Sequence, residues 1–252
     1  MSVQDKMREL CVSLGLYRPA RVLYRHLLNR EKLALFHRDL AFYAQFLKDG
    51  ALCFDVGAHV GGVTELLLDL GARVVAFEPQ PDCMRQLRAR CGRSARLVAR
   101  RQALGSEPSE ATLCVRNKRA CSSLLEDWEG DIESRMTVAV TTLDNAIAEF
   151  GTPVYCKIDV EGWEFEVLKG LTQPIPFLSF EYHLWEREIE GTAACLKYLS
   201  RLGSLTINVT PGESLAFRYD RWRPVSDFLK VWPAEFRGQP AYGYGDIFVH
   251  MV

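Results

Sequence analysis

A repeated pattern constrains the fold more than any other feature: short apolar runs end at an acidic residue and alternate with helical segments. The runs that end in this way finish at Asp55, Glu78, Asp159 and Glu181. Strands that alternate with helices form right-handed βαβ units, so the pattern predicts an α/β fold with a mostly parallel sheet. Ligands of such sheets bind at the carboxyl ends of the strands, where these four carboxylates fall.

Hydrophobic periodicity places the individual elements. Strands are expected at residues 51–55, 73–77, 97–104, 111–115, 137–142, 154–158, 177–180, 205–209 and 247–251. Helices are expected at residues 63–70, 84–90, 144–150, 163–169 and 193–202. Residues 1–48 have helical spacing with a break at Pro19, so we expect an N-terminal helical extension (1–48) followed by one α/β domain (49–252).

Charge and cysteine usage exclude several classes of protein. The formal net charge of -1 argues against a protein that binds nucleic acid through general electrostatics. The eight cysteines include no CxxC pair, which favours a reduced intracellular protein over a secreted disulfide framework. No stretch approaches the ~18–20 apolar residues of a membrane span, and the N-terminus lacks a secretory signal. We therefore expect a cytoplasmic protein without a transmembrane segment, whose oligomeric state the sequence leaves open.

A glycine-containing loop follows the first strand of the α/β domain, in the order Asp55-Val56-Gly57-Ala58-His59-Val60-Gly61-Gly62. Such glycines let the backbone approach a ligand, although a tight turn from strand to helix would need them too. Glu78 ends the next strand and can accept both hydroxyls of a ribose. A dehydrogenase would carry Gly-x-Gly-x-x-Gly, whereas this chain has Asp55 at the first position and His59 at the middle one. An acidic residue there would repel a pyrophosphate but suits the ammonium of a methionine moiety, which favours S-adenosylmethionine over NAD.

A second motif runs Lys157-Ile158-Asp159-Val160-Glu161-Gly162-Trp163-Glu164 and continues to Lys169-Gly170. Carboxylates at a strand end are unfavourable unless they meet a partner. Asp159 or Glu161 could cap the helix that follows; alternatively, both face the methyl donor and the acceptor.

Together these segments make the chain similar to one known family. The ordered segments DVGAHVG, VVAFEPQP, ALG, TTLD, KIDVEGWEFEVLKGL and LSFEYH resemble the FkbM family of methyltransferases, over roughly residues 50–183. The resemblance implies a class I, Rossmann-like fold with a seven-stranded sheet, an antiparallel last strand and helices on both faces. It also implies transfer of a methyl group from S-adenosylmethionine to a hydroxyl of a small molecule, glycan or lipid.

The resemblance assigns roles to residues of this sequence. Asp55 and Gly57 would line the methionine side, and Glu78 would hold the ribose. Ala103 and Leu104 would lie near the adenine. The expected cofactor-binding set is completed by the loop residues His59 and Gly61 and by Asp159, which faces the transferred methyl group. His59 stands where many relatives carry Asn.

The acceptor side needs a general base if a hydroxyl is methylated. Asp159, Glu161 and His183 are the expected catalytic residues, with Asp159 as the acceptor-side carboxylate and Glu181 as a further candidate base. No metal is required by this scheme; if one is used, Asp159 and Glu181 at neighbouring strand ends are the expected ligands.

Two regions and two rival functions remain open at this stage. The aromatic-rich segment 211–244 could roof the acceptor site or form a small core of its own. The arginine-rich run between residues 85 and 101 is interpreted as a solvated face. The rivals are a nicotinamide-dependent oxidoreductase and a non-catalytic binding protein that retains the fold.

Overall fold

The computed structural model describes residues 11, 16, 17, 19, 20, 22, 23, 30–92, 94–117, 121–212, 214–239 and 242–252. The chain divides into two compact units, residues 1–101 and 102–252, each described here by itself. Most of the helical extension expected before residue 30 lies outside the described residues.

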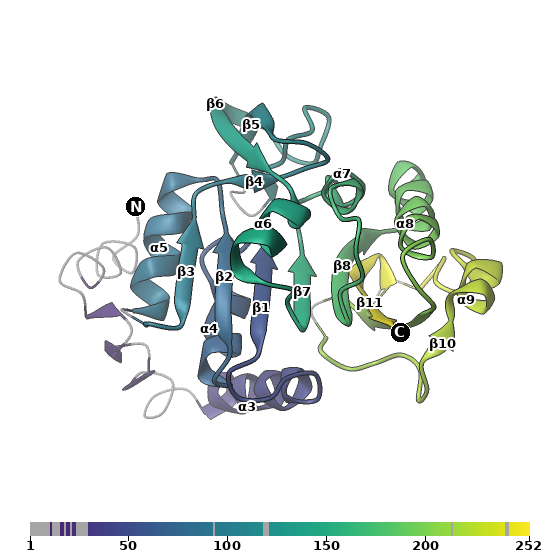
Figure 1. Cartoon of the computed structure of the whole chain (residues 1–252), viewed down its shortest axis with the longest axis horizontal. Helices are drawn as coiled ribbons and strands as arrows, with labels where there is room; N and C mark the ends of the chain where they lie inside the picture. Colours follow the sequence, from purple (N-terminus) through teal and green to yellow (C-terminus); the bar gives the residue numbers. More distant parts are fainter. Residues whose placement is uncertain are drawn as a thin grey trace. The chain divides into compact units, whose positions relative to one another are not determined.

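The first unit is a βαβαβ arrangement with a preceding helix (Figure 1). Its elements are α3 (Arg30–Ala44), β1 (Leu52–Val56), α4 (Gly62–Asp69), β2 (Arg73–Phe77), α5 (Pro81–Cys91) and β3 (Leu97–Arg100). The strands β1, β2 and β3 pair in parallel, with Val56 opposite Phe77. This register brings the residues after β1 and β2 to the same sheet edge.

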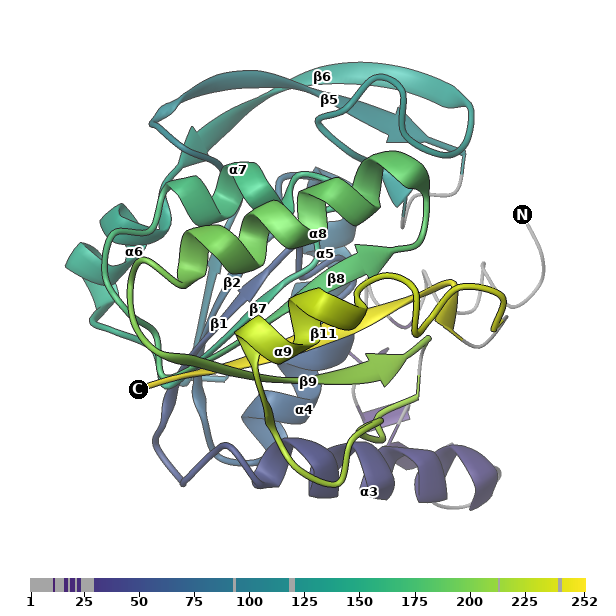
Figure 2. The same ribbon diagram turned by 90° about the vertical axis from the view of Figure 1, so that its right-hand side faces the viewer.

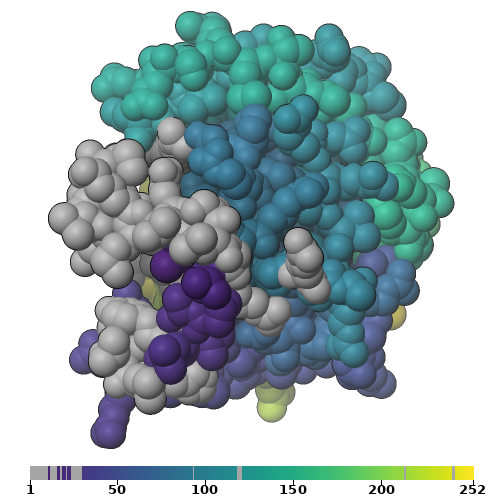
Figure 3. Space-filling view, turned by 90° about the vertical axis from the view of Figure 1, so that its left-hand side faces the viewer, coloured from purple at the N-terminus to yellow at the C-terminus, as the bar shows by residue number. Residues whose placement is uncertain are grey.

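Helices of the first unit bury their apolar sides and expose their charged sides. The core beside α5 includes Ala76 of β2 together with Met84 and Leu87 of α5. Arg85 and Arg88, on the opposite side of α5, are exposed, as expected for a solvated face. Figure 3 views the surface of the first unit that carries α5.

The second unit contains two sheets and four helices among its described residues. Its elements are β4 (Ala103–Leu104), β5 (Ser109–Arg116), β6 (Ile132–Thr141), α6 (Leu143–Phe150), β7 (Tyr155–Ile158), α7 (Glu164–Lys169), β8 (Phe177–His183), α8 (Glu186–Leu199), β9 (Leu205–Pro211), β10 (Arg223–Pro224), α9 (Val225–Val231) and β11 (Tyr244–Met251). One sheet has the order β4-β6-β5. In the other, β7 pairs with β8 in parallel, and the last strand, β11, runs antiparallel between β8 and β9.

The β7–β8 register positions the candidate site of the second unit. Ile158 lies opposite Phe180, so Asp159 and Glu181 follow at the same sheet edge. Helix α8 packs against α7 and β8, where Figure 2 shows the two helices side by side. Leu196 of α8 is fully buried.

Two expectations about elements were wrong. The strand expected at 97–104 is two strands in different sheets: β3 ends at Arg100, and Ala103 pairs with Val140 of β6. The polar pair Arg101-Gln102 interrupts the apolar run, so the chain leaves the first sheet there. Helix α8 begins at Glu186, seven residues before the expected start at 193. The expected start was too late because the first turns of the helix are charged and lack an apolar stripe.

Several other expectations are confirmed. The parallel βαβ pattern and the antiparallel last strand are present. All eight cysteines are free, as expected without a disulfide framework. The two-residue strand β10 at the sheet edge is an addition to the expected strands. Among the described helices, none has the length and apolar character needed to cross a membrane.

Candidate active site

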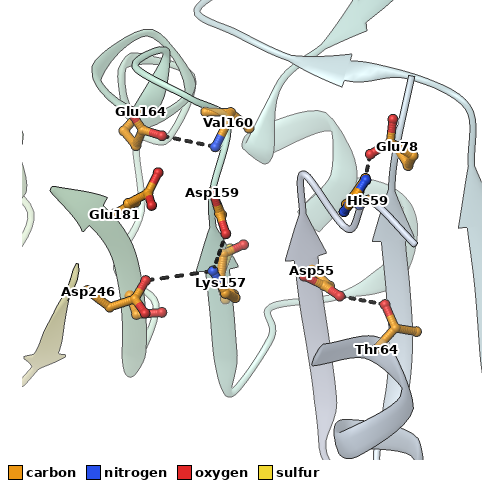
Figure 4. Close-up of polar contacts among 12 residues, drawn as sticks. Asp55, His59, Thr64, Glu78, Lys157, Asp159, Val160, Glu164, Glu181 and Asp246 are labelled. Atoms are coloured by element: carbon orange, nitrogen blue, oxygen red, sulfur yellow. Dashed lines mark hydrogen bonds and ion pairs between the residues drawn. The ribbon is translucent and has the colours of Figure 1, made fainter. Parts of the chain in front are cut away.

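The carboxylate at the end of β1 holds the first helix of its unit. Asp55 is 3% exposed, and Thr64 in α4 donates its hydroxyl to Asp55 Oδ2 at 2.5 Å (Figure 4). Thr64 is itself fully buried. Asp55 thus fixes α4 to β1, a structural task that the sequence analysis did not assign to it.

The loop between β1 and α4 uses left-handed backbone conformations. Gly57 and Gly61 have φ values of 79° and 78°, and His59 has a φ of 47°. Asn, Asp and His adopt this region more readily than most residues with a side chain, which gives a backbone reason for His59 at this position. The N–H groups of Gly57 and Ala58 both donate to the carbonyl oxygen of Phe77 at 3.0 Å. The loop is therefore tied to the end of β2.

Gly61 is required by packing inside the protein. A Cβ at this position would lie 2.9 Å from Cγ of Leu87 and 3.2 Å from its Cα. The glycine lets the start of α4 approach α5, a reason that differs from the ligand approach and the tight turn expected from the sequence.

Glu78 accepts two backbone hydrogen bonds. Its Oε2 accepts from the N–H of His59 at 2.8 Å (Figure 4). Its Oε1 accepts from the N–H of Gln80 at 2.7 Å. Burial raises the pKa of Glu78 to about 7, which the two N–H donors only partly oppose. Each carboxylate oxygen can accept a second hydrogen bond, so the side chain is held in place and can still bind a diol.

In the second unit, a buried lysine lies between two carboxylates. Lys157 Nζ is 2.7 Å from Asp159 Oδ2 and 3.6 Å from Asp246 Oδ1 (Figure 4). The side chain of Asp159 is 35% exposed, against 17% for Asp246. Burial raises the pKa of Asp246, and the Lys157 charge opposes that rise. Asp159 is thus an ion-paired carboxylate with access to solvent.

The turn after β7 is held by a buried glutamate and a left-handed residue. Glu164 at the start of α7 accepts the N–H of Val160 at 2.9 Å and is 5% exposed. Burial, and then the charge of Glu181, raise the pKa of Glu164 well above its ordinary value. Glu161 has a φ of 57°. This conformation is rare for a residue with a side chain and marks a site where surrounding contacts hold the backbone.

Those contacts come from the segment of residues 121–131, which we call the Trp128 loop. Ser123 donates its hydroxyl to the carbonyl oxygen of Glu161 at 2.7 Å. Trp128 Nε1 donates to Glu161 Oε2 at 2.9 Å. A Cβ on Gly162 would lie 2.3 Å from the Trp128 ring, so only glycine fits beneath it. Burial, and then the charge of Asp159, raise the pKa of Glu161 to about 7.

The last two residues of interest lie on β8. Glu181 Oε2 and His183 Nε2 are 3.2 Å apart, and both atoms are buried. Burial, followed by the charges of Asp159 and Glu161, raises the pKa of Glu181 well above its ordinary value. Burial lowers the pKa of His183, which favours the neutral ring. The structure therefore brings together Asp159, Glu161, Glu181 and His183.

Aromatic rings surround His183. Trp185 stacks on it with centroids 4.6 Å apart, and Tyr244 stacks at 6.1 Å. Trp128 meets the imidazole edge-on at 5.3 Å. Trp185 and Tyr244 are each 42% exposed, so both residues are partly open to solvent beside His183.

Two residues of this site were missed by the sequence analysis: Trp128 and Lys157. Lys157 stands inside the quoted motif, and its position two residues before Asp159 on a strand was the available signal. Trp128 lies between the strands expected at residues 111–115 and 137–142, where no local pattern marks it.

The aromatic-rich segment 211–244 is mainly a small core. Phe228 and Phe236 are fully buried, and Trp232 packs edge-on against Tyr182 of β8 with centroids 5.3 Å apart. Tyr244, at the end of the segment, instead stacks on His183. The core interpretation therefore holds for most of the segment.

Ala103 and Leu104, the expected adenine contacts, are both buried. Ala103 packs in a cluster with Leu113, Val138 and Val140 of the neighbouring strands. Their side chains stabilise the small sheet of the second unit.

Comparison with known proteins identifies a family. Residues 55–206 match the family model described as the methyltransferase FkbM domain. The chain is also 30% identical over 136 residues to the hexuronic acid methyltransferase AglP of Haloferax volcanii. That match covers 52% of this chain and 55% of the relative, so the chain spans about half the length of the curated relative it matches.

Solved structures show distant likeness. An rRNA methylase from Streptococcus thermophilus is 12% identical with a TM-score of 0.45, covering 86% of this chain and 95% of its own. A TehB-like SAM-dependent methyltransferase from Corynebacterium glutamicum is 12% identical with a TM-score of 0.44, covering 88% and 97%. Neither likeness says what this chain acts on.

Proposed function

The chain belongs to the FkbM family of S-adenosylmethionine-dependent methyltransferases, and on this premise we propose that it methylates a hydroxyl group of a sugar. The family assignment replaces the nicotinamide oxidoreductase that the sequence analysis kept as a rival. The matched relative, AglP, is a hexuronic acid methyltransferase, which supports a sugar as the acceptor.

The observation that carries the proposal is the set of aromatic rings beside carboxylates in the second unit. Sugars present apolar C–H faces that stack on aromatic rings and hydroxyls that bind carboxylates. Trp185 and Tyr244 are partly exposed aromatic residues next to His183, and Asp159 offers a solvent-accessible carboxylate. A lipid chain would instead favour a wholly apolar lining.

The first unit supplies groups suited to the methyl donor. We assign the ribose hydroxyls to Glu78, whose two oxygens are held by backbone N–H groups and can each accept one more hydrogen bond. Asp55 is the candidate partner for the ammonium of the methionine moiety. The Gly57–Gly61 loop provides the backbone surface for the ligand.

The chemistry is a single displacement at carbon. The hydroxyl oxygen of the sugar forms a bond to the methyl carbon, the carbon–sulfur bond breaks, and its electron pair remains on sulfur to give S-adenosylhomocysteine. The hydroxyl proton leaves to a base, a role that we assign to Asp159 because its carboxylate pairs with Lys157 and remains partly exposed. Glu161 and His183 complete the acceptor-side set.

Two assays test this function. Calorimetry should show binding of S-adenosylhomocysteine, and labelled methyl groups from S-adenosylmethionine should appear on hexuronic acids or neutral hexoses rather than on long-chain alcohols. Binding without transfer to any hydroxyl would support the non-catalytic alternative. Transfer to the alcohols alone would overturn the sugar assignment while leaving the methyltransferase in place.

A further inference from the structure

Three potential metal-binding side chains meet in the second unit. Glu161 on the turn after β7, and Glu181 and His183 on β8, each offer one ligand atom, and these atoms lie within 4.8 Å of one another. All three side chains are partly buried. The cluster is a mixed set of two oxygens and one nitrogen, which distinguishes it from a simple patch of acidic residues.

The geometry of the pair on β8 fits a shared cation. Two adjacent ligands of a cation with bonds of ~2.1–2.2 Å lie about 3 Å apart. Glu181 Oε2 and His183 Nε2 are 3.2 Å apart. Both atoms are shielded from solvent, and neither makes an aligned hydrogen bond with the described residues. Buried polar atoms normally have partners, so this pair is arranged for a ligand.

The charges point to a cation. Among the described residues, no lysine or arginine nitrogen lies within ion-pair distance of Glu161 or Glu181. The nearby Lys157 pairs with Asp159 and Asp246 instead. Two partly buried carboxylates without a cationic partner are unfavourable, and a divalent ion would compensate both.

Neighbouring contacts orient the cluster from outside. Trp128 Nε1 donates to Glu161 Oε2, which restrains the carboxylate. Ser123 holds the Glu161 carbonyl. Trp185 stacks on the His183 ring and restricts its rotation. Outer contacts of this kind are typical of metal sites, where they fix the orientation of the ligands.

We propose that Glu161, Glu181 and His183 bind one divalent transition-metal cation, such as Mn²⁺, which holds oxygen atoms of the acceptor. The imidazole ligand favours a transition metal over Mg²⁺ or Ca²⁺, which prefer oxygen ligands alone. The site differs from the pair of metal ligands considered from the sequence, Asp159 and Glu181, because Asp159 forms an ion pair with Lys157. The role toward the acceptor rests on the proposed function, whereas cation binding does not.

Titration of the full chain with MnCl₂, followed by electron paramagnetic resonance of free Mn²⁺, tests the site without cofactor or acceptor. We expect one saturable site, and affinity at least tenfold weaker in Glu181→Gln and in His183→Phe. Both changes keep side-chain shape: the amide replaces a carboxylate, and phenyl can still stack on Trp185. Glu186→Gln, which removes an exposed carboxylate at the start of α8, should leave the affinity unchanged.

Folding is checked on the same samples by binding of S-adenosylhomocysteine, which the variants should retain. If Glu181→Gln fails this check, His183→Phe and Glu161→Gln decide the result. Absence of saturable Mn²⁺ binding to the unaltered chain, or equal affinity in the folded variants, would overturn the proposal. Either outcome leaves the methyltransferase assignment untouched, since that depends on cofactor binding and methyl transfer.

Discussion

The carboxylates of the two units differ in how their oxygens are hydrogen-bonded. In the first unit, Asp55 is bound by Thr64, and Glu78 is bound by two backbone N–H groups. In the second unit, Glu161 has Trp128 as a partner, but Glu181 has a buried oxygen without an aligned hydrogen bond. The first group is fixed by the short segment that contains it. The second depends on contacts from distant parts of the chain.

This difference matches two different tasks. A cofactor of constant shape is best met by a rigid site whose polar groups are already oriented. Carboxylates that cluster together are instead typical of sites where charge or protons must be handled. We therefore interpret the first unit as the donor side and the second as the acceptor side, and five experiments test that comparison.

The largest effect is expected for Asp159→Asn. The amide keeps the shape of the side chain but cannot accept a proton, so turnover should fall on the order of 100-fold or more. The affinity for S-adenosylhomocysteine should change little, because the change lies on the acceptor side. Glu166→Gln, which alters a surface pair with Lys169 on α7, is the control. A joint loss of affinity and turnover would move Asp159 to the donor side, and wild-type turnover would remove it from catalysis.

Gly162→Ala should destabilise the second unit. The added Cβ would meet the Trp128 ring at 2.3 Å on a backbone with a φ of 90°, so we expect the free energy of unfolding to fall by roughly 2–3 kcal/mol. Gly238→Ala is the matched control, because its φ is 77° but nothing lies within 4 Å. Denaturant titration measures both. Equal losses would show that backbone strain, rather than contact with Trp128, dominates at Gly162.

Cofactor binding should depend on pH through Glu78. Its pKa of about 7 means that the carboxyl is increasingly protonated as the pH falls below 7. Ribose hydroxyls donate more strongly to the ionised form, so affinity for S-adenosylhomocysteine should rise up to about tenfold between pH 6 and 8. Glu78→Gln should bind more weakly at pH 8 and show a flat profile in calorimetry. An unchanged slope in that variant would assign the titration to another group.

The same shift predicts a change in stability without ligand. The pKa of Glu78 is raised in the folded chain from 4.5 to about 7, so the folded state holds a proton that the unfolded state has lost in this interval. Stability should therefore decrease as the pH rises from about 4.5 to about 7, and Glu78→Gln should reduce that slope.

The smallest effects are expected for one matched pair of variants. Thr64→Val removes the hydroxyl bound to Asp55, and Trp128→Phe removes the N–H bound to Glu161. Each should lower the free energy of unfolding by about 1 kcal/mol, the usual net value of one hydrogen bond. Only Thr64→Val should also weaken binding of S-adenosylhomocysteine, measured by calorimetry. Weaker cofactor binding in Trp128→Phe would contradict the division into donor and acceptor sides.

The sequence was most informative where function depends on neighbours along the chain. The strand ends at Asp55, Glu78 and Asp159 were predictable because apolar runs and glycine turns mark them locally. The β7–β8 pairing of consecutive strands also made the proximity of Glu181 predictable.

Features that depend on tertiary contacts were not predictable. Trp128 lies 33 residues from Glu161, and no periodic pattern connects them. The 97–104 run is divided between two sheets because β4 pairs with β6, a strand that lies far later in the chain. The sequence could not show that Gly61 is needed for packing against Leu87 rather than for the approach of a ligand, because Leu87 is brought next to it only by the fold.

The fully buried Arg116 has a consequence for exchanging parts between relatives. Its guanidinium donates to the carbonyl oxygens of Gly130 and Leu125 at 2.7 Å and of Glu126 at 3.0 Å. The Trp128 loop therefore owes its shape to a residue that lies before it in the chain. Transfer of the loop alone into a homologous protein would include the Trp128 indole but not Arg116, whose hydrogen bonds hold the loop in place. Arg116 must therefore be transferred together with the loop if the loop is to keep its shape.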